Sequence, residues 1–184
     1  MGEVTVLLRE ARQGKADAIA RLFEVIHPEL KRIARFRLAQ DDGGTHLNTT
    51  ALVNECCLKL ASAETLTPQD RAHFLAYASA AMRSIIVDAA RARLAQRRGG
   101  GERPVTLDSA VIGSLPSGHE ECLYVHDALA ELQAIDARVA RVVEMRYFGG
   151  MTDAEIGAAL ELSAKTVRRD WDKARLILAA SLQR

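Results

Sequence analysis

The sequence predicts an all-α protein made of two small helical domains joined by a flexible linker. Apolar residues recur at helical spacing along most of the 184 residues, as in Ala18, Ile19, Leu22, Phe23 and Ile26. Only four prolines occur, and alternating β-branched runs are scarce, whereas alanine, leucine and arginine are frequent. A stretch with glycines and prolines over residues 99–121 separates the two helical regions, so we assign domains to residues 1–98 and 122–184.

Composition narrows the function classes. Lysine plus arginine (25) balances aspartate plus glutamate (24), so nucleic-acid binding would have to rest on local charge. A hydrophobic content of 48% excludes a disordered chain. The three cysteines, Cys56, Cys57 and Cys122, have the spacing of neither a disulfide framework nor a metal site. With no membrane-length apolar run and no signal-peptide pattern at the start, we expect a cytoplasmic protein without membrane contact, metal or cofactor.

The first domain should contain four helices. Gly14 separates a short helix from a longer one, and a polar break at 41–44 ends the second. Asn48-Thr49-Thr50, all good N-cap residues, precede a helix whose apolar positions are Leu52, Val53, Cys56 and Leu60. A break at 65–70 is followed by an uninterrupted helical pattern from Arg71 to about Arg98.

The second domain should contain three or four helices after an acidic linker. Residues 104–127 hold four acidic residues and no lysine or arginine. Helices are expected over 123–134 and 136–148, with Gly149-Gly150 as a stop. Thr152 and Glu155 have capping-box spacing before a short helix that ends near Leu160. Ser163 then caps a last helix that runs to about Leu182.

The last two helices have the pattern of a helix-turn-helix motif. A short helix and a three-residue turn precede a basic helix, and Gly157 is small enough to let the helices cross closely. Val167 and Trp171 should face the core. The residues then left to contact duplex DNA are Lys165, Thr166, Arg168 and Arg169 for bases and Lys173 and Arg175 for phosphates.

A second basic concentration ends the first domain, where residues 83–98 hold five arginines and one aspartate. The helix dipole favours cations at a helix C-terminus, so this cluster could be structural or could bind phosphates. Phe74 and Tyr77, upstream, could stack on unpaired bases or fill the core.

In these motifs and their order the chain resembles the extracytoplasmic-function group of bacterial sigma factors. Residues 52–60 look like the helix that binds core RNA polymerase, and residues 74–98 like the segment that melts and reads the minus-ten promoter element. Residues 146–175 look like the domain that reads the minus-thirty-five element. The resemblance implies an alternative sigma factor whose partners are core RNA polymerase and promoter DNA.

The resemblance also implies roles for particular residues. The minus-ten set comprises Phe74, Tyr77, Arg83, Ser84, Arg91, Arg93, Arg97 and Arg98. A loop near residues 82–85, between two helices of the melting segment, would capture a flipped base. The polymerase-binding set comprises Leu52, Asn54, Glu55 and Lys59. The acidic linker would thread a channel of the polymerase.

The sequence departs from the family pattern at the start of the polymerase-binding helix. Most members have several acidic residues there, whereas residues 48–54 hold none. Losing these charges weakens complementarity to a basic partner. A phosphothreonine would restore about −1.5 to −2 charges at a helix N-terminus. We therefore hypothesise that a Ser/Thr protein kinase activates the protein at Thr50, with Thr49 as the second choice; the alternative is that both threonines serve only as caps.

Two other classes of function compete with this interpretation. A conventional helix-turn-helix regulator would bind duplex DNA without polymerase, but it leaves the basic end of the first domain unexplained. An enzyme is disfavoured because the five histidines are scattered and no nucleophile–base pair is legible, so no catalytic residue is assigned. The glycines at 99–101 follow a basic helix rather than a strand, unlike a phosphate-binding loop.

Overall fold

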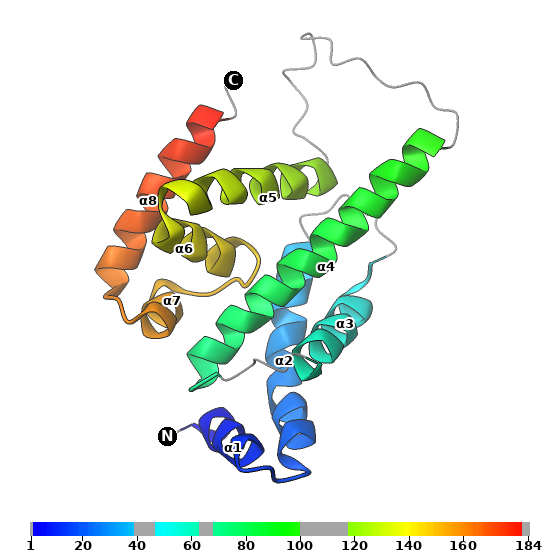
Figure 1. Ribbon diagram of the computed structural model, residues 1–184, viewed down its shortest axis with the longest axis vertical. Helices are drawn as coiled ribbons and strands as arrows, with labels where there is room; N and C mark the ends of the chain where they lie inside the picture. The colour runs from blue at the N-terminus through cyan, green and yellow to red at the C-terminus, as the bar shows by residue number, and fades with distance from the viewer. Residues whose placement is uncertain (1, 39–46, 63–67, 100–117, 182–184) are drawn as a thin grey trace.

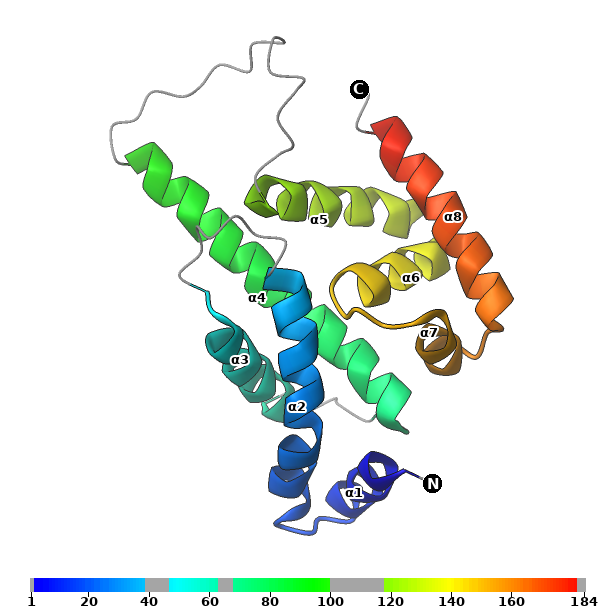
Figure 2. The same cartoon turned by 180° about the vertical axis from the view of Figure 1, so that it is seen from behind.

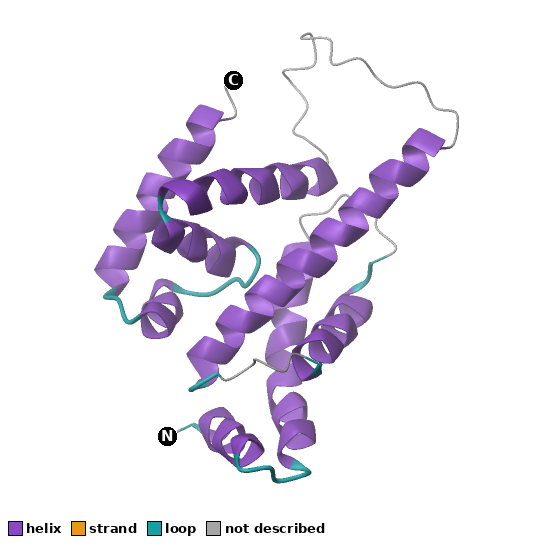
Figure 3. Cartoon of the chain, in the orientation of Figure 1, coloured by secondary structure: helices purple, strands orange, loops and turns teal. Residues whose placement is uncertain are grey.

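The protein is all-helical over the part that the structure, a computed structural model, describes: residues 2–38, 47–62, 68–99 and 118–181. Figure 3 shows helices and loops only. The helices are α1 (Glu3–Arg12), α2 (Ala18–Leu38), α3 (Thr49–Ala61), α4 (Arg71–Gly99), α5 (Gly118–Ile135), α6 (Ala137–Tyr147), α7 (Asp153–Leu160) and α8 (Ala164–Ser181). The predicted all-α class is confirmed.

The helices form two groups, which we call the N-terminal helices (α1–α4) and the C-terminal helices (α5–α8). In the first group α2 packs on α1 and α3, and α3 packs on α4. In the second group α6 packs on α5 and α8, and α7 packs on α8. Figures 1 and 2 show α4 as a long diagonal helix between α2 and α3 on one side and the C-terminal helices on the other, with α8 on the side remote from it.

Residues near several helix ends have the side chains or backbone angles that favour starting or ending a helix there. Gly14, at φ +76°, lies between α1 and α2, as expected of a residue that adopts positive φ without steric cost. Asn48 caps the N-terminus of α3, where its Oδ1 accepts from Ala51 N–H at 2.9 Å. Asp136 caps the N-terminus of α6, where its Oδ1 accepts from Val139 N–H at 3.2 Å. Helix α5 begins at Gly118, five residues before the predicted Leu123. Acidic residues 120 and 121 suit a first helical turn, which explains the earlier start.

The apolar core is continuous across both groups. Buried side chains from α1–α4, including Leu30, Leu52 and Met82, belong to one cluster with Leu132 and Phe148 from the C-terminal helices. The two groups are consistent with the predicted two-domain arrangement, and the buried cluster continues from one group to the other. Of the linker predicted over 99–121, residues 100–117 lie outside the described residues, and the prediction is wrong at both ends, because Gly99 is the last residue of α4 and residues 118–121 form the start of α5.

Candidate nucleic-acid and polymerase interfaces

The predicted helix-turn-helix is formed by α7 and α8. Thr152 and Glu155 make the capping box: Glu155 N–H donates to Thr152 Oγ1 at 3.3 Å, and Thr152 N–H donates to Glu155 Oε2 at 2.9 Å. The turn uses Glu161 at φ 56°, and Leu162 N–H donates to the carbonyl of Gly157 at 2.8 Å. A Cβ on Gly157 would lie 2.6 Å from the Leu162 carbonyl oxygen, so only glycine permits this approach.

Helix α8 turns one face inward and leaves a basic face outward. Val167, Asp170 and Ala174 are buried, and Trp171 is partly buried under the guanidinium of Arg146, 4.8 Å from the ring centre. The predicted duplex-binding residues Lys165, Arg168, Arg169 and Arg175 are all exposed. Exposed cations with an anchored opposite face are the arrangement that a groove-reading helix requires.

Two predicted contact residues of this helix have partners within the protein. Thr166 is half-buried and accepts or donates a hydrogen bond with Ser163 Oγ at 2.9 Å, and its N–H donates to the same oxygen at 3.1 Å. Lys173 Nζ pairs with Asp136 Oδ2 at 2.8 Å. This hydrogen bond from Lys173, together with that from Val139 N–H, lowers the pKa of Asp136. Lys173 remains about half exposed, so it can still reach a phosphate.

An ion pair orients the inner face of α8. Asp170 is 2% exposed, and its carboxylate accepts from Arg138 Nε of α6 at 2.8 Å and from Arg138 Nη2 at 3.3 Å. This fork fixes the rotation of α8 against α6, because both carboxylate oxygens are engaged. The role of Asp170 was not predicted from the sequence. The sequence did contain a signal for it, because Asp170 is an acidic residue on the apolar face of the helix, between Val167 and Ala174.

The predicted minus-ten residues on α4 have mixed positions. Tyr77 is 41% exposed, and Arg91 is exposed, whereas Arg93 is half-buried. Ser84 Oγ accepts from Lys59 Nζ at 2.6 Å and lies 3.4 Å from the carboxylate of Asp88. The side chains of Arg97 and Arg98 lie outside the described residues.

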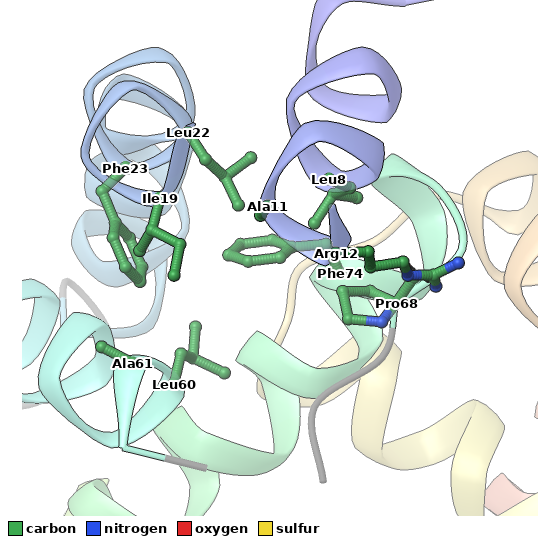
Figure 4. A pocket seen from close by; sticks show the side chains of 10 residues that line it. All are labelled: Leu8, Ala11, Arg12, Ile19, Leu22, Phe23, Leu60, Ala61, Pro68 and Phe74. Carbon is green, nitrogen blue, oxygen red and sulfur yellow. Dashed lines mark hydrogen bonds between the residues drawn. The ribbon is translucent and has the colours of Figure 1, made fainter. Parts of the chain in front are cut away.

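Phe74 is in the core and is a correction to the predicted minus-ten set. Its ring is 1% exposed and meets Phe23 edge-on, with the ring centres 6.4 Å apart. Figure 4 shows the ring among apolar side chains of α1 and α2, beside a cavity of about 170 Å³. A ring held in this position cannot stack on a base. Of the two roles considered for Phe74, stacking on bases or filling the core, the structure shows the second.

Arg83 is engaged by the C-terminal helices. Its Nη1 pairs with Glu144 Oε1 of α6 at 2.8 Å, and its Nε donates to His126 Nδ1 of α5 at 3.2 Å. Burial and then the charges of Arg83 and Arg91 lower the pKa of His126, which keeps the imidazole neutral as an acceptor. Arg83 is thus a cation shared between the two groups of helices.

The helix predicted to bind polymerase presents a narrower surface than expected. Asn54 and Glu55 are exposed, and Lys59 is exposed while bonded to Ser84. Leu52 is a correction, because it is 0% exposed and packs in the core. Leu58, by contrast, is 70% exposed and was not singled out. Its signal in the sequence was its phase, since it lies off the stripe formed by Leu52, Val53, Cys56 and Leu60.

Thr49 and Thr50 lie in the first turn of α3, which contains no acidic residue. Thr50 is exposed, and Thr49 is half-buried. The capping position belongs to Asn48, whose side chain accepts from Ala51 N–H. The helix therefore has its cap without a hydroxyl from either threonine.

The described residues contain neither a metal-binding cluster nor a membrane-spanning helix. They contain no group of three or more His, Cys, Asp or Glu side chains placed to hold a metal ion. None of their helices is long and apolar enough to cross a bilayer. The cavity in Figure 4 has an apolar lining apart from Arg12, whose Nη2 donates to the Pro68 carbonyl at 2.6 Å.

One comparison with known proteins shows the family of this chain. The family model described as ECF sigma factor matches residues 1–184. The chain belongs to the ECF sigma factor family. Among solved structures it is similar to CnrH in complex with the cytosolic domain of CnrY, at 22% identity, with 97% of this chain and 96% of that chain covered and a TM-score of 0.43. No curated protein matches it.

Family membership makes the chain an alternative sigma factor that directs transcription through RNA polymerase and promoter DNA, and not an enzyme.

One expectation carried over from the family is wrong for this sigma factor. No loop interrupts the melting segment at residues 82–85, because α4 is helical from Arg71 to Gly99. Met82, Ile85 and Ile86 are buried there and hold the helix on the core. The preceding helix, α3, ends at Ala61, and α4 begins at Arg71.

Proposed function

We propose that this sigma factor reads the minus-ten element with the N-terminal helices and the minus-thirty-five element with α8. The exposed face of α3 would bind core polymerase in the cytoplasm. Support for the α8 assignment comes from its five exposed cations and its buried inner face. For the minus-ten role we retain Tyr77, Arg83, Ser84, Arg91 and Arg93, because each has a side chain at least partly accessible. Arg97 and Arg98 stay in this set on their sequence alone.

The polymerase-binding face that we propose runs along α3 through Thr50, Asn54 and Leu58. These residues are four apart and exposed, so they lie on one side of the helix. A large apolar side chain at 70% exposure suits the centre of a protein interface. Glu55 and Lys59 flank this line.

We further propose that phosphorylation of Thr50 by a Ser/Thr protein kinase activates the sigma factor. The observation that supports this proposal is that the N-cap of α3 is Asn48 and not a threonine. Asn48 supplies the cap, which leaves Thr50 exposed in a first turn that lacks any acidic residue. A phosphate there adds negative charge where the helix dipole favours it. Thr49 is the weaker candidate because it is half-buried.

The test compares purified unmodified and Thr50-phosphorylated protein in core-polymerase binding and run-off transcription. We expect only the phosphorylated form to bind core and start transcripts. Thr50→Ala should abolish activation while leaving the helical content intact, and Thr50→Glu should restore part of it. Thr49→Ala is the matched control on the adjacent residue. Equal activity of the unmodified protein or of Thr50→Ala would overturn the switch. A protein that shifts duplex DNA but never binds core would overturn the polymerase-binding assignment.

A further inference from the structure

The second half of α2 carries an exposed basic and aromatic surface that has no part in the function proposed above. Residues 31–38 hold four lysines and arginines and no acidic residue. Arg32, Arg35 and Phe36 are exposed there. Because Arg35 and Phe36 follow Arg32 by three and four positions, one side of the helix presents all three side chains. We call these three residues the α2 patch.

The side chains of the α2 patch remain accessible to a ligand. Phe36 is 54% exposed, more than any other aromatic side chain that the structure describes. The side chain of Arg32 is 61% exposed and lies 4.0 Å from the carboxylate of Glu29, and Arg35 has no ion pair within the described part of the chain. The helix dipole favours cations in the last turns of a helix, but it does not explain an exposed ring among them.

The α2 patch borders the beginning of α4. Glu29, three residues before Arg32, also pairs with Arg71, the first residue of α4. Tyr77 of the proposed minus-ten set is 41% exposed and lies six residues further on, which is about 9 Å along the helix. A strand that contacts the first turns of α4 can therefore extend onto the α2 patch.

Cations beside an exposed aromatic ring are the combination that binds single-stranded nucleic acid. Guanidinium groups pair with phosphates, and an aromatic ring stacks on the face of an unpaired base. In a duplex the base faces are already stacked on one another, so a duplex offers this surface its phosphates alone. The exposed ring of Phe36 thus favours a single strand over a duplex as the ligand.

We propose that the α2 patch binds single-stranded DNA, with Arg32 and Arg35 on phosphates and the ring of Phe36 stacked on an unpaired base. The identity of the strand rests on the proposed function, since it is the promoter strand released when α4 melts the minus-ten element. A base that is stacked on Phe36 cannot pair with the other strand. The α2 patch therefore shifts the equilibrium toward the melted promoter.

The free full-length protein tests this surface without polymerase. The probe is a fluorescein-labelled single-stranded oligonucleotide of about 12 nucleotides, within the range of about 4–16 that single-strand sites cover. Anisotropy titrations at several salt concentrations give its Kd. Phe36→Ala should weaken binding by about fivefold or more, because stacking is lost, and should leave the salt dependence unchanged. Phe36→Tyr keeps a ring and should bind like the wild type.

Arg35→Gln should change the salt dependence instead. Loss of one phosphate contact on a single strand lowers the slope of log affinity against log salt concentration by about 0.7. Two exposed residues of α2 outside the patch provide matched controls: Arg21→Gln removes a cation and Val25→Ala shortens an apolar side chain. Both controls should leave the Kd and the slope nearly unchanged.

Crosslinking in the polymerase complex tests where the strand lies. Phe36→p-benzoylphenylalanine places a photoreactive ring in the α2 patch. With Thr50-phosphorylated protein, core polymerase and promoter DNA, we expect illumination to crosslink this residue to one strand of a melted promoter. A duplex promoter kept closed at low temperature should give no crosslink.

The outcomes separate this inference from the proposed function. Equal binding by the wild type and Phe36→Ala, or equal affinity for the single strand and its duplex, would overturn the α2 patch as a single-strand site. Crosslinks to a polymerase subunit instead of DNA would overturn it as well, because the surface would then be a protein interface. If the phosphorylated wild type neither binds core nor transcribes, the proposed function fails, whereas the oligonucleotide titrations still decide whether α2 binds single strands.

Discussion

Three polar side chains are buried among the described residues, and each is placed where two helices must keep a fixed relation. Asp170 ties α8 to α6, Arg37 ties α2 to Tyr147 at the end of α6, and Ser79 lies against Gly149 and Met151. Ser79 Oγ also donates to the carbonyl of Leu75 at 2.7 Å. Burying a polar group is costly unless its hydrogen bonds are made, so these side chains favour one geometry over near alternatives.

The Asp170–Arg138 pair gives the prediction at this scale. Arg138→Met keeps most of the side-chain volume but leaves the buried Asp170 carboxylate without its fork, so it should lower the free energy of unfolding by about 1–3 kcal/mol. Urea denaturation at pH 7 measures the change. Arg141→Met, exposed on the same helix, is the control and should change the midpoint little. Equal midpoints for the two variants would show that the pair contributes nothing to stability.

At the scale of single elements, capping carboxylates begin three helices. Asp70 accepts from His73 N–H at 2.9 Å before α4, Asp136 caps α6, and Glu155 completes the capping box of α7. The pKa of each is lowered. At Asp136 the causes are Lys173 and Val139 N–H. At Asp70, hydrogen bonds with His73 outweigh the opposing effect of burial, and at Glu155, hydrogen bonds with Thr152 and Arg71 do so. The starts of these three helices therefore depend on ionised side chains.

Acid titration of Asp136 tests this dependence. Its folded-state pKa lies below the unfolded value of about 3.9, so its contribution is complete above about pH 4 and is lost as pH falls through the folded pKa. Asp136→Asn keeps an oxygen for Val139 N–H but cannot titrate. We expect the variant to lose less unfolding free energy than the wild type between about pH 4.5 and pH 2. Parallel curves for the two proteins would contradict the role of this carboxylate.

The helix-turn-helix gives a second prediction about an element. Gly157→Ala would force a Cβ to within 2.6 Å of the Leu162 carbonyl and push α7 from the turn. We expect a loss of about 1–3 kcal/mol in unfolding free energy, typical of overpacking, together with weaker duplex binding by α8. Thermal unfolding and a promoter mobility shift with core polymerase and the Thr50-phosphorylated protein provide the readouts. Ala158→Ser, an exposed neighbour of similar size change, should affect neither.

At the scale of the whole molecule, α4 belongs to both groups of helices. It packs on α3 within the N-terminal group and on α5, α6 and α7 of the C-terminal group. Its length of 29 residues is about 43 Å at 1.5 Å per residue, which is long enough to touch all of them. The free chain should consequently unfold as one cooperative unit, although its sequence divides into two regions.

Tyr147→Phe tests that coupling without disturbing either group alone. The ring still stacks on Arg37, but the hydroxyl that accepts from its guanidinium is lost, which should weaken the contact by about 1–3 kcal/mol. Hydrogen exchange of α4 amides should rise in this variant. Tyr124→Phe is the matched control: its hydroxyl donates to the Leu178 carbonyl inside the C-terminal group, at 2.8 Å, so α4 should be unaffected. An equal rise in both variants would argue against the coupling.

Patterns of local origin were predictable from the sequence. The capping box at Thr152 and Glu155, the turn after Leu160 and the inward face of Val167 depend on residues close in the chain, and the structure has each of them. The helix from Arg71 to Gly99 was also expected. The structure contradicts the predicted exposure of Phe74 and Leu52 and the predicted loop at 82–85. These predictions rested on the family resemblance or on a residue type that occurs both in cores and at binding sites. An aromatic or a leucine can serve a core or a ligand, and only burial decides between them.

The sequence by itself determined the all-α class, the helix-turn-helix, the basic face of α8 and the missing acidic residues before Leu52, because helical periodicity, caps and charge are properties of neighbouring residues. Tertiary structure alone decided that Arg83 and Arg71 meet Glu144 and Glu155 and that Arg37 is buried on Tyr147. These partners are between 61 and 110 residues apart in the three contacts named. No local rule specifies such pairings, since they arise only when the two groups of helices pack and share one core.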